Sequence, residues 1–63
     1  MYIIELEKGV WVTKGQGDPP RTLVKENASR FTTDRKALIY LNRIRKVYPR
    51  KGWKEAKIYG VIN

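Results

Sequence analysis

Hydrophobic and polar residues alternate near the start of the chain, which is the pattern of a β-strand with one buried face. In residues 2–7 the face expected to be buried holds Tyr2, Ile4 and Leu6. Lys8-Gly9 predicts a tight turn, because glycine adopts the positive φ that such turns need. Residues 10–13 then predict an antiparallel return strand, with Val10 and Val12 on the face opposite Trp11.

The next stretch predicts a break in the sheet and a short return to it. Residues 14–20 contain two glycines, two prolines and an aspartate, which predicts a flexible, exposed loop. Residues 21–25 predict a short third strand. Residues 27–31 predict a bend or a single helical turn that leads into a helix.

The middle of the chain carries the pattern of an amphipathic helix. Its apolar stripe has spacings of four, three and four residues and consists of Ala37, Leu41, Ile44 and Tyr48, with Leu38, Tyr40 and Val47 at its margins. Thr32 or Thr33 can cap the helix, and Asp34 in the first turn suits the helix dipole. Pro49 ends the helix, because the residue before a proline is disfavoured in the α region.

A last strand completes the predicted fold. Residues 55–62 alternate again, and the inward face would hold Ala56, Ile58, Gly60 and Ile62. The predicted fold class is α+β: a small antiparallel sheet of three to four strands packed on one α-helix, in the order β-β-(β)-α-β. The core would bring Leu41 and Ile44 against Ile4, Leu6, Val10, Val12, Ile58 and Ile62. The last strand can pair with the first in either orientation.

The composition limits the kinds of protein that fit. The chain has 63 residues, which allows one domain spanning residues 1–63. It contains no Cys and no His, which excludes thiol chemistry, disulfides, the usual zinc ligand sets and histidine acid–base catalysis. We therefore expect a protein that is not an enzyme, with no catalytic residues, no metal and no cofactor. The apolar stretches are too short to cross a bilayer and no signal peptide precedes them, so we expect no membrane partner and a cytoplasmic location.

Positive charge is concentrated in the second half of the sequence. The net charge is +8, and residues 32–63 hold nine basic and two acidic side chains. No acidic residue lies between Arg35 and Lys54. Helical spacing places Lys36, Arg43, Lys46 and Arg50 opposite Leu41, with Arg35 beside them. A helix face that meets only water commonly carries charge, but such faces usually mix both signs.

Several exposed-looking apolar residues accompany this charge. Trp53 lies between Lys51 and Lys54, and aromatic rings among cations can stack on bases. The alternative interpretation is that Trp53, Trp11 and Tyr59 shield the second face of the sheet. Ile39 projects from the basic side of the helix and can contact a thymine methyl group or a protein. A single exposed isoleucine is also ordinary.

The start of the helix supports a resemblance. The segment Phe31-Thr32-Thr33-Asp34-Arg35-Lys36-Ala37 has the form F-x-T-x-x-x-A, and together with the two preceding strands it resembles small phage- and prophage-encoded α+β proteins of unassigned function. The order of three strands and a helix is similar to the arm-type DNA-binding domain of phage integrases, in which the sheet enters the major groove. The resemblance implies a phage-like origin. The chain departs from that domain because its charge lies on the helix and beyond, and because a further strand follows.

Two functional hypotheses follow. The first is a small nucleic-acid-binding protein, with DNA favoured over RNA, whose binding residues are Arg35, Lys36, Arg43, Lys46, Arg50, Lys51, Trp53 and Lys54. The second is a phage-type modulator or inhibitor that binds an acidic surface of a host protein through its charge together with Ile39 and Trp11. Either protein would act as a monomer or as a homodimer formed through a sheet edge.

Overall fold

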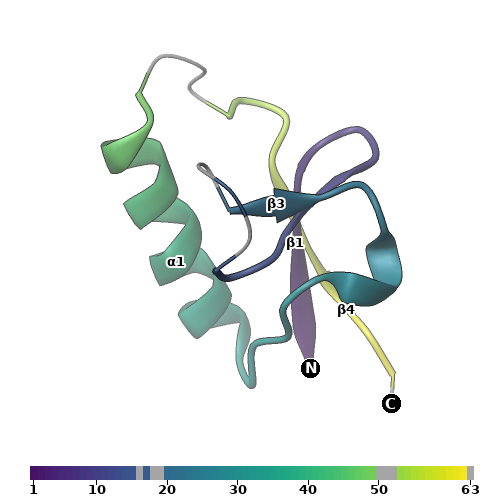
Figure 1. The fold of residues 1–63 in the computed structure, drawn as a ribbon. Coiled ribbons are helices and arrows are strands. Elements are labelled where there is room, and N and C mark those ends of the chain that lie inside the picture. Colours follow the sequence, from purple (N-terminus) through teal and green to yellow (C-terminus); the bar gives the residue numbers. More distant parts are fainter. Residues whose placement is uncertain (16, 18–19, 50–52, 63) are drawn as a thin grey trace.

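The computed structural model of the chain describes residues 1–15, 17, 20–49 and 53–62. This part of the chain forms four strands, one α-helix and one short 3₁₀ helix (Figure 1). In chain order, the elements are β1 (Tyr2–Glu7), β2 (Val10–Val12), β3 (Arg21–Thr22), η1 (Lys25–Asn27), α1 (Asp34–Val47) and β4 (Lys57–Gly60). The predicted α+β fold, with one antiparallel sheet against one helix, is confirmed.

The sheet is antiparallel throughout and has the strand order β3-β2-β1-β4. β1 therefore lies inside the sheet, and its partner β4 comes from the other end of the sequence. The pairing runs from Tyr2 opposite Gly60 to Glu5 opposite Lys57. The orientation that the sequence left open is thus antiparallel.

The turn between β1 and β2 forms where the sequence predicts it. Gly9 has a φ of 77°, the left-handed conformation that glycine adopts without steric cost. The Gly9 N–H donates to the Glu5 carboxylate at 3.1 Å. The register shifts between Glu5 and Glu7, so the hairpin contains an irregularity just before its turn.

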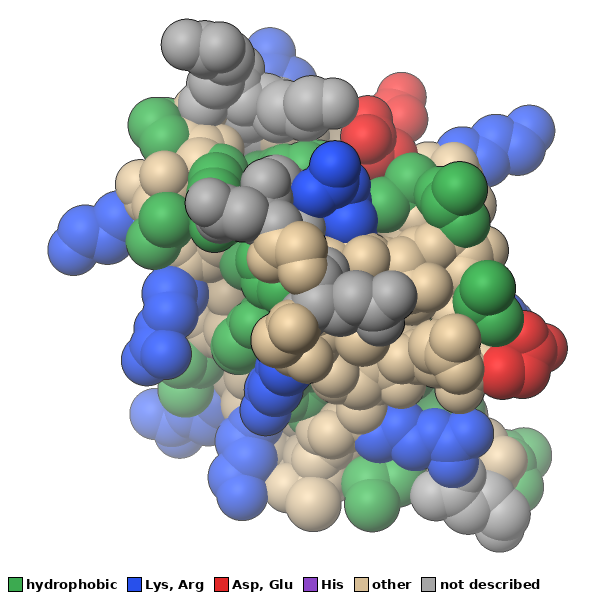
Figure 2. Space-filling model, viewed as in Figure 1, with side chains coloured by type: hydrophobic (Ala, Val, Ile, Leu, Met, Phe, Trp, Pro, Cys, Tyr) green, Lys and Arg blue, Asp and Glu red, His purple; other side chains and the backbone are tan. Residues whose placement is uncertain are grey.

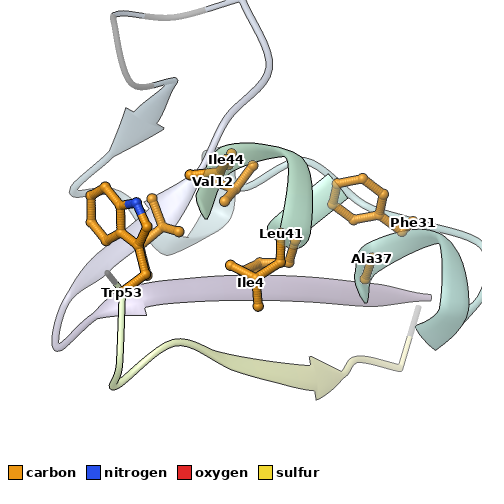
Figure 3. Close-up of a cluster of buried hydrophobic side chains, with 8 residues drawn as sticks. Ile4, Val12, Phe31, Ala37, Leu41, Ile44 and Trp53 are labelled. Carbon is orange, nitrogen blue, oxygen red and sulfur yellow. The ribbon is translucent and has the colours of Figure 1, made fainter. Parts of the chain in front are cut away.

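Alternation along β1 and β2 produces two separate apolar clusters, one on each face of the sheet. The main core lies between the sheet and α1 and contains Ile4, Leu6, Val12, Phe31, Ala37, Leu41, Ile44 and Trp53. In Figure 3 the three helix residues of this cluster point toward Ile4 and Val12, with Trp53 at one end and Phe31 at the other. The second cluster lies on the opposite face and contains Ile3, Trp11 and Ala28. The predicted faces of both strands are confirmed.

The segment between β3 and α1 differs from the prediction. The single helical turn is at Lys25–Asn27, earlier than the predicted 27–31. Residues 28–30 have no regular secondary structure, and Phe31 pairs with Tyr2 through two backbone hydrogen bonds of 2.8 Å. β2 pairs with β1 only at Glu5 and Glu7, so the same edge of β1 is open at Tyr2 and pairs there with Phe31. The predicted turn was therefore placed too late in the chain.

Two other predicted elements are longer than those observed. β3 has two residues instead of five, and Leu23 and Val24 beyond it are exposed. β4 ends at Gly60, and Ile62 is fully exposed at 101%. The predicted contact of Ile62 with Leu41 and Ile44 is therefore wrong. In the predicted loop 14–20, Gln16, Asp18 and Pro19 lie outside the described residues.

The helix begins and ends at signals present in the sequence. Of the two candidate caps, Thr33 is the one used: its hydroxyl accepts a 3.1 Å hydrogen bond from the Lys36 N–H. α1 ends at Val47, and the Tyr48 N–H closes the last turn by donating to the Ile44 carbonyl at 2.8 Å. Ala37, Leu41 and Ile44 are its buried residues, as the apolar stripe predicts.

The cap gives a stability prediction. We expect Thr33→Ala to lower the free energy of unfolding by about 1 kcal/mol, because one N–H of the first turn loses its acceptor. Urea unfolding followed by circular dichroism measures this difference. Thr32→Ala is the matched control, since the neighbouring exposed threonine makes no capping bond in α1. Equal losses in the two variants would contradict the assignment of the cap.

Candidate nucleic-acid interface

The candidate interface is the side of α1 that faces away from the sheet. We call its four exposed basic residues, Arg35, Lys36, Arg43 and Lys46, the cationic helix face. They point outward because Ala37, Leu41 and Ile44 hold the other side of the helix against the sheet. α1 forms the outermost layer of the molecule on this side (Figure 1).

The charges of this face are not neutralised from within the described part of the chain. None of the four side chains forms an ion pair with a described carboxylate. Figure 2 shows Lys and Arg side chains along the edge formed by α1, at the left of the view, interleaved with apolar side chains, and no acidic side chain is visible on that edge. An uncompensated row of cations raises the local positive potential and attracts polyanions.

Arg45 belongs to the same helix but serves the fold. It is half-buried at the side of α1, and its guanidinium Nη2 donates to the Trp53 carbonyl at 3.0 Å. The bond fastens the turn at residues 53–55 to the last turns of the helix. Arg45 was not among the predicted site residues, and the structure gives it this supporting role.

The structure corrects the assignment of Trp53. Its side chain is only 3% exposed and lies in the main core, so its ring is not available to stack on a base. Its φ of 51° is in the left-handed region, which is uncommon for a residue other than glycine. Trp53 adopts this conformation within a turn, and its indole lies between the sheet and the end of the helix.

Lys54 is exposed but lies apart from the cationic helix face. It lines a shallow surface hollow with Glu7 and Glu55, and a second one with Glu5 and Lys57. The sequence from Arg35 to Lys54 contains no acidic residue, but in the folded chain Lys54 lies near the carboxylates of β1. Arg50 and Lys51, the other two predicted site residues, lie outside the described residues. The structure thus brings together Arg35, Lys36, Arg43 and Lys46.

Glu5 is held on the face of the sheet opposite α1. The Gly9 backbone N–H is the main reason that the pKa of Glu5 lies below its usual value, and the Tyr59 hydroxyl and nearby Lys57 and Lys25 add to it. The Tyr59 hydroxyl donates to this carboxylate at 3.0 Å, which raises the pKa of Tyr59. Glu5 therefore has partners of its own and does not neutralise the cationic helix face.

Trp11 of the second cluster and the neighbouring Tyr59 contact each other through their rings. Trp11 is 9% exposed, its ring centroid lies 6.0 Å from that of Tyr59, and the Lys25 ammonium lies 5.4 Å from its ring. The interpretation that aromatics shield the sheet's second face is confirmed for Trp11. Tyr59 packs beside it but is 38% exposed, and Trp53 lies on the other face, in the main core. Trp11 is not the exposed contact residue that the host-protein hypothesis assumed.

No group of three or more acidic, His or Cys side chains suited to a metal ion occurs among the described residues. The helical segments in the described ranges include none with the length and apolar character needed to cross a membrane. Comparison with protein-family models, curated proteins and solved structures gives no significant match. The resemblance to phage proteins therefore stays a prediction.

Proposed function

We propose that this chain is a small, non-enzymatic nucleic-acid-binding domain that contacts phosphates through the cationic helix face. The observation that carries the proposal is the arrangement of Arg35, Lys36, Arg43 and Lys46, which are exposed, on one side of one helix, and without an ion-paired carboxylate among the described residues. Such contacts neutralise phosphates, release condensed counterions and position the protein on the nucleic acid.

The proposal predicts a specific dependence on salt. Four phosphate contacts correspond to a slope of about −3.6 for the logarithm of the binding constant against the logarithm of salt concentration on B-form DNA. The triple variant Lys36→Ala/Arg43→Ala/Lys46→Ala should keep one contact and a slope of about −0.9. Fluorescence anisotropy with a labelled duplex, measured at several salt concentrations, gives both slopes.

A matched control separates local from overall charge. Lys8→Ala/Lys54→Ala/Lys57→Ala removes the same number of exposed positive charges from outside α1, where these lysines line one surface hollow with Glu5 and Glu55. We expect this variant to keep nearly the full slope, because its residues lie outside the cationic helix face. Equal weakening by the two triple variants, or a slope near zero for the unchanged protein, would contradict the proposal.

A second candidate function rests on the apolar residues of the same surface. Ile39 is 54% exposed and Val47 is 59% exposed, both among cations. A mixed basic and apolar face also suits an acidic surface of a host protein, because charge steers protein association as well. A stoichiometric partner that survives nuclease treatment and is lost with the helix-face triple variant would favour this function over nucleic-acid binding.

A further inference from the structure

The row of side chains on α1 that points most directly away from the sheet has two uncharged residues at its centre. Arg35, Ile39, Asn42 and Lys46 follow one another at spacings of four, three and four residues, and we call them the outer row. The buried stripe has the same spacings and begins two residues later, at Ala37. Since two residues rotate a helix by about 200°, the outer row lies almost diametrically opposite the core. Ile39 and Asn42 are therefore the side chains that a ligand of this face meets between two cations.

Both central side chains are available for contact. Ile39 is 54% exposed, although it is a large apolar residue. Asn42 is exposed, and its amide makes no side-chain hydrogen bond to the described residues. Phosphate contacts carry no sequence information, and although an asparagine can make one, an isoleucine cannot. Phosphate binding alone therefore does not account for Ile39 at the centre of this row.

The surroundings of the outer row favour a duplex over a single strand. Binding of single strands relies on exposed aromatic rings on which bases stack. Trp53 and Phe31 are buried in the main core, and Tyr40 and Tyr48 are half-buried against it. The cationic helix face therefore has no fully exposed ring among the described residues. The major groove of A-form RNA is too narrow and deep for side chains to read, which leaves B-form DNA.

The dimensions of α1 match the major groove of B-form DNA. The groove is about 12 Å wide and admits one α-helix, whose diameter with side chains is about 10–12 Å. The 11 residue steps from Arg35 to Lys46 span about 16 Å along the axis, which places a cation at each end of the groove contact. Ile39 and Asn42 lie about 4.5 Å apart along the axis, which is between one and two base-pair steps of about 3.4 Å, so they can reach neighbouring base pairs.

Resting on the proposed function, we propose that α1 lies in the major groove of duplex DNA and reads an A·T-containing site through Asn42 and Ile39. The Asn42 amide donates to N7 or accepts from N6 of adenine, and in the bidentate geometry it does both. Ile39 contacts the methyl group of a neighbouring thymine. Arg35 and Lys46 contact phosphates at the two ends of the groove contact. Lys36 and Arg43 lie together on one side of the outer row and contact phosphates along that side of the groove.

The test compares the full chain and its Asn42→Ala variant on two duplexes of equal length, one of A·T pairs and one of G·C pairs. We expect the unchanged protein to prefer the A·T duplex by about 5- to 150-fold, the range of one bidentate contact. Asn42→Ala should bring this ratio close to one and leave the salt slope unchanged, since no phosphate contact is lost. Asn27→Ala, at an exposed asparagine in η1 away from α1, is the matched control and should keep the preference.

A change in the DNA tests Ile39 separately. Replacing thymine by uracil removes only the methyl group, and we expect the unchanged protein to bind the uracil duplex about 4-fold more weakly. The Ile39→Ala variant should bind the thymine duplex and the uracil duplex with nearly equal affinity. A protein that shows the expected salt slope but binds the A·T and G·C duplexes equally well, or that prefers single strands, overturns this inference and leaves the proposed function standing. Absence of binding to every nucleic acid at low salt overturns both.

Discussion

Trp53→Ala is expected to lower the free energy of unfolding by about 3–5 kcal/mol, the usual cost of removing a buried tryptophan from a packed core. Trp53 is 3% exposed and closes one end of the main core (Figure 3). A domain of this size seldom has more than about 3–5 kcal/mol of stability in total. We therefore expect the variant to be largely unfolded at 25 °C by near-UV circular dichroism and by urea titration.

The backbone at Trp53 supplies a sharper comparison. Because φ is 51°, alanine keeps the cost of the left-handed conformation, about 1–2 kcal/mol, whereas glycine does not. Trp53→Gly should therefore be no less stable than Trp53→Ala, the reverse of the usual order of these two residues in a folded chain. A Trp53→Ala protein that stays as stable as the unchanged chain would contradict the burial of this side chain.

Leu41→Ala is expected to cost about 2–5 kcal/mol, since it opens a cavity at the centre of the contact between α1 and the sheet. Leu41 is 3% exposed and belongs to the same cluster as Ile4 and Ile44. Urea unfolding measures the loss. Leu38→Ala is the matched control because Leu38 lies on the same helix and is 45% exposed, so its removal should cost much less. Similar losses for the two leucines would contradict the orientation of the helix, on which the cationic helix face depends.

The parts of the fold that follow from local sequence were predictable. The alternation of Tyr2, Ile4 and Leu6, the glycine in the first turn and the helical spacing of Ala37, Leu41 and Ile44 each report one element and its buried face. These signals act over a few residues and do not depend on the rest of the chain. They were sufficient for the α+β class and for the direction in which α1 faces.

The parts that depend on contacts between distant segments were not predictable from the pattern. Trp53 has lysines on both sides in its local sequence, which suggested exposure, but its position is decided by the space between Leu6 and the end of α1. The strand pattern of β4 continues to Ile62, yet Met1 forms its last backbone pairing with Val61, and Ile62 has no sheet to cover it.

The candidate site divides in the same way. Arg35, Lys36, Arg43 and Lys46 share one helix, so their common side follows from helical geometry alone. Lys54 lies beyond the helix, and its neighbourhood includes Glu7 of β1, which no reading of residues 35–54 reveals. Asn42, which we propose as a base contact, was not singled out from the sequence because it is uncharged, although its spacing from Ile39 and Lys46 was available there.

The position of β4 has a consequence for how the chain acquires its structure. β1 and β4 are the first and last strands, and the Ile3–Tyr59 and Ile4–Ile58 pairs join them. During synthesis the β1–β2 hairpin and α1 leave the ribosome before β4 does, so one long edge of β1 stays unpaired until residues 57–60 emerge. Contacts of such large sequence separation form late and slow the folding rate. Until then, the nascent polypeptide presents an open strand that a chaperone or a neighbouring nascent chain can occupy.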